Sequence, residues 1–160
     1  MEITIIGAGA IGGVLGAYIK KGGESVVFCD IVETHVEQIR TSGLTIEGPD
    51  ETIIVKTEAF TPTELLKRNK PLEIVFICVK AHHAQAAIDQ VSSLLTEKTI
   101  IVSFQNGVAN PEIPKKLTVP APLCCFVNFS ADYLEPGRIL YGGVSSEIGR
   151  ASCRERVSTS

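Results

Sequence analysis

The chain has 160 residues, of which 44% are hydrophobic and 21% are charged, and its formal net charge is −3. This composition predicts one globular domain with a hydrophobic core, and the acidic balance excludes the basic surface that nucleic-acid binding requires. No apolar run approaches the roughly 20 residues that a membrane-spanning helix needs, and the N-terminus lacks a secretory signal pattern. We therefore expect a cytoplasmic protein that binds neither nucleic acid nor membrane.

An apolar strand pattern at residues 3–6 leads directly into a glycine-rich turn with the spacing G-x-G-x-x-G. In this pattern the first glycine allows a tight turn, the second lets the backbone approach a pyrophosphate, and the third lets a helix pack closely on the sheet. The N-terminus of that helix attracts phosphates through its free N–H groups and its partial positive charge. The alternative is a purely structural turn. The position between strand and helix favours a dinucleotide site formed by Gly7, Ala8, Gly9, Ala10, Ile11 and Gly12.

Strand and helix patterns then alternate along the chain. Strands are predicted at residues 25–29, 44–47, 52–57, 73–79 and 99–104. Helices are predicted at residues 11–21, 34–40, 62–70 and 84–95, and Thr61 and Glu64 form a capping box at the third. Beyond Pro122 the pattern predicts two antiparallel strands, at residues 123–131 and 138–141. The alternation predicts an α/β fold with a doubly wound parallel sheet, followed by antiparallel strands at the C-terminal end.

Asp30 directly follows the second predicted strand, close to the expected spacing of about 20 residues after the glycine pattern. In a dinucleotide-binding fold, an acidic residue here accepts hydrogen bonds from ribose hydroxyls, whereas a basic residue accommodates a 2′-phosphate. A carboxylate repels a 2′-phosphate, and no lysine or arginine follows Asp30 before Arg40. Asp30 therefore favours NAD over NADP; the alternative is that it only caps the next turn.

Two polar residues follow later strands, at the sheet edge where open α/β folds bind ligands. Lys80 follows the strand predicted at residues 73–79, and Asn106 follows the one at 99–104. Lys80 could hold a carboxylate or a cofactor group, and Asn106 could hydrogen-bond a nicotinamide or a substrate carbonyl. Taken alone, each residue is more simply interpreted as part of an ordinary loop.

The cysteines and histidines give little indication of further chemistry. The five cysteines form no C-x-x-C pair, which predicts buried, reduced thiols. His82 and His83 lie near Cys78, but Cys78 is predicted on a strand and no fourth ligand is suitably spaced. We expect no metal site.

Several motifs in order resemble the N-terminal cofactor domain of the ketopantoate reductase (2-dehydropantoate 2-reductase) family. They are GAGAIGG at residues 7–13, ICVKAHH at 77–83, SFQNGVANPE at 103–112 and the run at 129–149. The resemblance implies a Rossmann-type NAD(P)-binding domain over residues 1–146. It also implies hydride transfer from NAD(P)H to the keto carbon of ketopantoate, which gives pantoate for coenzyme A synthesis. The implied role of the glycine turn is to hold the pyrophosphate, and that of Lys80 and Asn106 is to line the nicotinamide and substrate cleft.

The chain departs from this family in two respects. The family generally uses NADP and often has a basic residue after the second strand, where this chain has Asp30. The resemblance also implies a helical second domain that supplies a general-acid lysine and a substrate-binding acid, and a homodimer of the full-length protein. Neither of those two residues can be assigned in this chain. General acid catalysis typically contributes about 10²–10⁴ in rate, so we expect this chain to bind a dinucleotide and to reduce ketopantoate slowly or not at all.

The last residues, 147–160, contain EIGRASCRERV and have no apolar periodicity. Their back-translation looks like a common sequencing-adapter read, which predicts a non-native tail; the alternative is a genuine basic tail. Two other functions remain open for the chain. One is a related NAD-dependent 2-oxo or 3-oxo acid dehydrogenase. The other is a non-catalytic nucleotide-sensing module, which would have no reason to carry Lys80 and Asn106.

Overall fold

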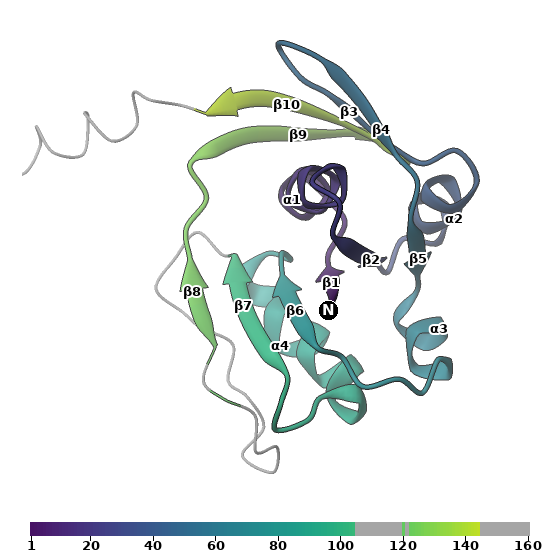
Figure 1. The fold of residues 1–160 in the computed structure, drawn as a ribbon, viewed down its shortest axis with the longest axis vertical. Helices are drawn as coiled ribbons and strands as arrows, with labels where there is room; N and C mark the ends of the chain where they lie inside the picture. The colour runs from purple at the N-terminus through teal and green to yellow at the C-terminus, as the bar shows by residue number, and fades with distance from the viewer. Residues whose placement is uncertain (105–119, 121, 145–160) are drawn as a thin grey trace, which may run out of the picture.

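The computed structural model describes residues 1–104, 120 and 122–144, and these form two β-sheets with helix α1 between them (Figure 1). The first sheet has six parallel strands in the order β5-β2-β1-β6-β7-β8. Its strands are β1 (Glu2–Ile6), β2 (Ser25–Cys29), β5 (Glu58–Phe60), β6 (Ile74–Ile77), β7 (Ile100–Phe104) and β8 (Leu123–Cys125). The predicted α/β fold with a parallel sheet is confirmed.

The second sheet is mixed and has the order β4-β3-β10-β9. Its strands are β3 (Leu44–Glu47), β4 (Thr52–Val55), β9 (Phe129–Glu135) and β10 (Arg138–Val144). The helices are α1 (Ala10–Lys21), α2 (Glu33–Thr41), α3 (Pro62–Lys67) and α4 (Ala81–Val91), with a 3₁₀ turn at Ser92–Leu94. None of the helices in the described ranges is long and apolar enough to cross a membrane.

Side chains that alternate along the parallel strands build two separate cores. Ile5 of β1 and Phe28 of β2 belong to the core that α1, α2 and the second sheet cover. Ile6 and Cys29, their neighbours in sequence, belong to the core that α3 and α4 cover. Successive residues of a strand point to opposite faces, so both faces of the parallel sheet are buried, which explains the nearly continuous apolar runs of its strands.

Helix α1 lies between the two sheets, so it is packed on opposite sides (Figure 1). Val14 and Ala17 of α1 are buried in the core that also contains Leu44 and Ile139 of the second sheet. Gly13 allows a close approach to this sheet, because a Cβ added there would lie 2.1 Å from Ile139 Cδ1. The second sheet therefore fixes the position of the helix that begins at the glycine turn.

Several predicted helices and strands differ from the observed ones by a few residues at their ends, and in two places the strands themselves were predicted wrongly. Residues 123–131 do not form one antiparallel strand, because β8 pairs in parallel with β7 and a separate strand, β9, pairs antiparallel with β10. The predicted strand at 52–57 ends at Val55, and a further short strand, β5, pairs in parallel with β2 at the edge of the first sheet. In both places the chain crosses from one sheet to the other within a few residues, which an apolar pattern does not reveal. The tail predicted at residues 147–160 lies outside the described residues.

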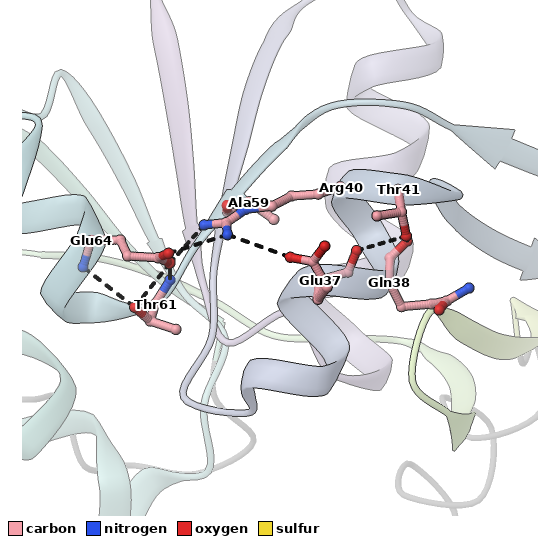
Figure 2. Close-up of polar contacts among 7 residues, drawn as sticks. All are labelled: Glu37, Gln38, Arg40, Thr41, Ala59, Thr61 and Glu64. Carbon is pink, nitrogen blue, oxygen red and sulfur yellow. Dashed lines mark hydrogen bonds and ion pairs between the residues drawn. The ribbon is translucent and has the colours of Figure 1, made fainter.

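A hydrogen-bonded network at Arg40 joins α2, β5 and the start of α3 (Figure 2). Arg40 Nε donates to the carbonyl oxygen of Ala59 at 2.6 Å, and its Nη2 donates to Glu64 Oε2 at 2.6 Å. The same carboxylate oxygen accepts the N–H of Thr61 at 2.8 Å, and Thr61 Oγ1 accepts the N–H of Glu64 at 3.3 Å. The predicted capping box is therefore present, and it is tied to α2 through Arg40.

This network predicts a pH dependence of stability. The Arg40 guanidinium and the Thr61 N–H lower the pKa of Glu64 from its ordinary 4.5 to about 2. A carboxylate whose pKa is lower in the folded state stabilises the fold above its unfolded pKa, and this contribution is lost as the pH falls from about 5 towards 2. In urea unfolding over that range, Glu64→Gln should lose less stability than the unmodified chain. Glu24→Gln, at an exposed carboxylate with no ion pair in the described ranges, is the control. Equal slopes for the two variants would contradict the prediction.

Candidate cofactor-binding site

The glycine turn connects the carboxyl end of β1 to the first turn of α1. Gly7 has a φ of 91°, a conformation that favours glycine, and its N–H donates to the carbonyl oxygen of Cys29 at 2.8 Å. A Cβ added at Gly12 would lie 1.9 Å from the carbonyl oxygen of Gly7. At Gly9, by contrast, an added Cβ would have no heavy atom outside its immediate neighbours within 4 Å. The turn is therefore tightly packed at Gly12 and open at Gly9.

Gly9, where the turn is open, is the N-cap residue of α1. No side chain caps this end of the helix, and its first turn carries no acidic residue. The first N–H groups of a helix have no partner within the helix, so they are available to an anion. The space at Gly9 and the uncapped helix end together suit a phosphate group that approaches the backbone.

The carboxylate of Asp30 lies beside the glycine turn. Its Oδ2 accepts the N–H of Ala8 at 2.8 Å, and its Oδ1 accepts the N–H of Val32 at 2.9 Å. The second bond is the turn cap that the sequence left open as an alternative, whereas the first ties the carboxylate to the predicted phosphate loop. Each carboxylate oxygen can accept a further hydrogen bond, so capping the turn leaves Asp30 able to bind hydroxyl groups.

Two pockets lie at the carboxyl edge of the parallel sheet and share Val79 as a wall. The first has a volume of about 220 Å³, and its lining includes Gly7, Asp30, Ile31, Val79, His83 and Ala87. The second has a volume of about 260 Å³ and is lined by Ile11, Cys78, Val79, Lys80, Ala81, Phe104 and Val127. Gly7 and Ile11 belong to the turn and to α1, so an elongated ligand that crosses the turn would reach both pockets.

Comparison with known proteins identifies the family of the chain. The family described as Ketopantoate reductase PanE/ApbA matches residues 3–152. The chain belongs to this family. A 2-dehydropantoate 2-reductase of Mesorhizobium japonicum is 35% identical over 108 residues, which are 68% of this chain and 32% of that protein.

Solved structures show the same fold. A PanE/ApbA family ketopantoate reductase from Ralstonia eutropha has a TM-score of 0.76 and 26% identity, with 89% of this chain and 47% of that chain covered. A D-mandelate dehydrogenase solved with NADH and anilino(oxo)acetate has a TM-score of 0.78, with 96% of this chain and 52% of that chain covered. Its identity of 22% shows similarity of fold alone. The chain thus spans about a third of the curated reductase and about half of these solved chains.

Of the two residues predicted to line the cleft, the structure describes one. Lys80 is the exposed N-cap residue of α4 and lines the second pocket with Ile11 and Phe104. Asn106 lies outside the described residues. Lys80 therefore stands where a positive charge could face an anionic group in the pocket, and the predicted role of Asn106 stays a prediction.

The thiols near the site are not activated nucleophiles. Burial raises the pKa of the Cys78 thiol, and burial together with the Asp30 carboxylate raises that of Cys29 to about 12. Both thiols are therefore protonated at neutral pH. The prediction of buried thiols is confirmed for Cys29 and is wrong for Cys124, which is exposed because β8 lies at the sheet edge. Cys78 and Cys125 are half-buried, and Cys153 lies outside the described residues. Within the described part of the chain, no group of three or more His, Cys, Asp or Glu residues is placed to hold a metal ion.

Sequence reasoning missed one residue of the site, His35 of α2. Its side chain is 1% exposed, and its Nε2 lies 2.8 Å from the carbonyl oxygen of Ala8 in the glycine turn. Helical spacing carried a signal, because His35 lies one turn before the inward-facing Ile39. A polar residue is not what an amphipathic pattern assigns to the buried face of a helix, although a buried histidine with two partners is well tolerated.

Proposed function

We propose that this chain binds NAD(H) across the two pockets and forms the cofactor-binding part of a 2-dehydropantoate 2-reductase, over residues 1–146. The observation that carries the proposal is the carboxylate of Asp30, held 2.8 Å from the N–H of Ala8, beside a turn that is open at Gly9. These are the features that a dinucleotide needs at one edge of a parallel sheet: a ribose acceptor and a backbone that admits a pyrophosphate.

The lining residues suggest how the chain would hold the dinucleotide. Asp30 would accept hydrogen bonds from the adenosine ribose, and the base would lie in the first pocket, near Ile31 and Val79. The pyrophosphate would lie over Gly9 at the start of α1. The nicotinamide would then occupy the second pocket, whose lining includes Phe104.

Bound NADH would supply the hydride for reduction of a keto group. The chain's own residues would position and shield that chemistry. The ammonium of Lys80 is exposed at the pocket and would attract the carboxylate of a 2-oxo acid. Ile11 and Phe104 are apolar walls of the same pocket and would exclude water from the reacting face. Asn106 would hydrogen-bond a carbonyl in the same cleft.

The matched segments cover only part of each relative, and a reductase of another 2-oxo acid would need every residue argued above. The family resemblance assigns the general acid and the substrate-binding acid to a helical domain. We propose ketopantoate as the substrate, because a relative with 35% identity is a 2-dehydropantoate 2-reductase, and we propose that turnover needs both of those acids.

Titration of the purified chain with NADH and NADPH, followed by nicotinamide fluorescence, tests the proposal. We expect NADH to bind at least about tenfold more tightly, which corresponds to ~1.4 kcal/mol of repulsion between Asp30 and a 2′-phosphate. Asp30→Asn removes the negative charge and should reduce the preference for NADH over NADPH. Asp50→Asn, on the exposed turn between β3 and β4, should leave the preference unchanged. Failure to bind either dinucleotide would refute the proposed function, and tighter binding of NADPH would refute the cofactor preference.

A further inference from the structure

His35 connects three segments that are far apart in the sequence. It belongs to α2, its Nε2 lies 2.8 Å from the carbonyl oxygen of Ala8, and its Nδ1 accepts the N–H of Gly137 at 2.9 Å. Gly137 lies in the turn between β9 and β10 of the second sheet. A single buried imidazole ring therefore links the glycine turn to the sheet that covers α1.

The two contacts determine which nitrogen of His35 carries the proton. A backbone N–H can only donate, so Nδ1 must present its lone pair to Gly137. A carbonyl oxygen can only accept, so Nε2 must carry the proton that it donates to Ala8. The neutral Nε2–H tautomer satisfies both partners at once, whereas the other tautomer and the cation would place an N–H against the N–H of Gly137.

The ring is held in this orientation by its surroundings. Tyr133 of β9 lies edge-on to it, with ring centroids 5.1 Å apart. The turn between β9 and β10 packs closely against α2, because a Cβ added at Gly137 would lie 2.4 Å from Gln38 Cγ. His35 therefore has little freedom to swing away from Ala8 while the second sheet is in place.

The bond to His35 sets the direction of a peptide group in the glycine turn. Ala8 is fully buried; Asp30 accepts its N–H, and His35 donates to its carbonyl oxygen. The structure contains no cis peptide bond among its described residues, so the carbonyl of Ala8 and the N–H of Gly9 point in opposite directions. With the carbonyl held on a buried ring, the N–H of Gly9 points away from that ring.

We propose that His35 is a positioning residue for the dinucleotide, which acts by fixing the Ala8–Gly9 peptide in the orientation that presents Gly9 to the pyrophosphate. This inference rests on the proposed function, and it adds the second sheet to the cofactor site. The second sheet contributes through Gly137, which orients the ring of His35. That ring in turn orients the glycine turn. The N–H of Gly9 would already have this orientation before a ligand binds, so binding would not need to reorder the loop.

Two variants separate the contact with Ala8 from the contact with Gly137. In His35→Gln the amide reaches the position of Nε2 and can still donate to Ala8. In His35→Asn the amide reaches only the position of Nδ1 and can accept from Gly137. We expect NADH affinity to fall about tenfold in His35→Asn and less than about threefold in His35→Gln, as expected for one hydrogen bond lost or kept. Unfolding midpoints of both variants report any general loss of structure.

Equal losses of affinity in the two variants, or losses that follow their unfolding midpoints, would overturn the inference and leave the proposed function standing. No NADH binding by the unmodified chain would overturn both. Nitrogen-15 NMR of the histidine ring gives a readout that needs no ligand. The expected spectrum is that of the Nε2–H tautomer for His35, and the spectrum of the Nδ1–H tautomer would overturn the inference.

Discussion

Replacing Gly12 with alanine is expected to destabilise the chain by about 3 kcal/mol or more, which is a large part of the stability of a domain of this size. The added Cβ would lie 1.9 Å from the carbonyl oxygen of Gly7 and 2.9 Å from both Cys78 Cβ and Ile5 Cγ2. Two of these three atoms cannot rotate away, because one is backbone and one is itself a Cβ. Alanine gains about 1 kcal/mol over glycine in helix propensity, which offsets only part of the clash.

Thermal unfolding followed by circular dichroism measures this effect. A loss of about 3 kcal/mol corresponds to a decrease in Tm on the order of 10 °C for a chain of this length. A small shift of α1 away from the first sheet is opposed by the second sheet, because Ile139 already lies against α1 at the neighbouring Gly13. An unfolding temperature within about 2 °C of that of the unmodified chain would show that α1 can move, and would contradict the prediction.

Local patterns predicted most of the secondary structure because the relevant interactions are local. The strand at Ser25–Cys29 was predicted with its observed bounds, and the capping box of Thr61 and Glu64 lies within one helical turn. The pairing of strands was not predictable in the same way. Strand β3 pairs in parallel with β10 from the other end of the described chain, and β8 joins β7 rather than β9. The pairing of these strands depends on contacts between segments that are far apart in the sequence.

The residues of the candidate site also differ in whether local sequence or the pairing of strands decides their position. The glycine turn and Asp30 are recognisable in the sequence because a known spacing separates them. The bond of Asp30 to Ala8 follows from the parallel pairing of β1 and β2, which brings the ends of the two strands together. The role of His35 was not recognisable, because its partner Gly137 belongs to a sheet whose arrangement the sequence did not indicate.

Replacing Gly9 with alanine is expected to weaken NADH binding by about a hundredfold without lowering the unfolding temperature. Gly9 has a φ of −68°, which alanine adopts readily, and an added Cβ meets no heavy atom outside its immediate neighbours within 4 Å. Folding therefore has no steric reason to oppose the methyl group. The proposed pyrophosphate would lie in that space, and a loss of a hundredfold corresponds to ~2.7 kcal/mol, within the usual cost of overpacking.

The two alanine variants test different functions of one motif and serve as controls for each other. Gly12 lies where the helix meets the sheet, so its substitution should lower stability whether or not a ligand is present. Gly9 lies where the structure leaves space, so its substitution should act only on a ligand that fills it. Gly9→Ala that binds NADH as tightly as the unmodified chain would show that the space at Gly9 is not the pyrophosphate site. If Gly9→Ala instead unfolds like Gly12→Ala, the openness of the turn is itself refuted.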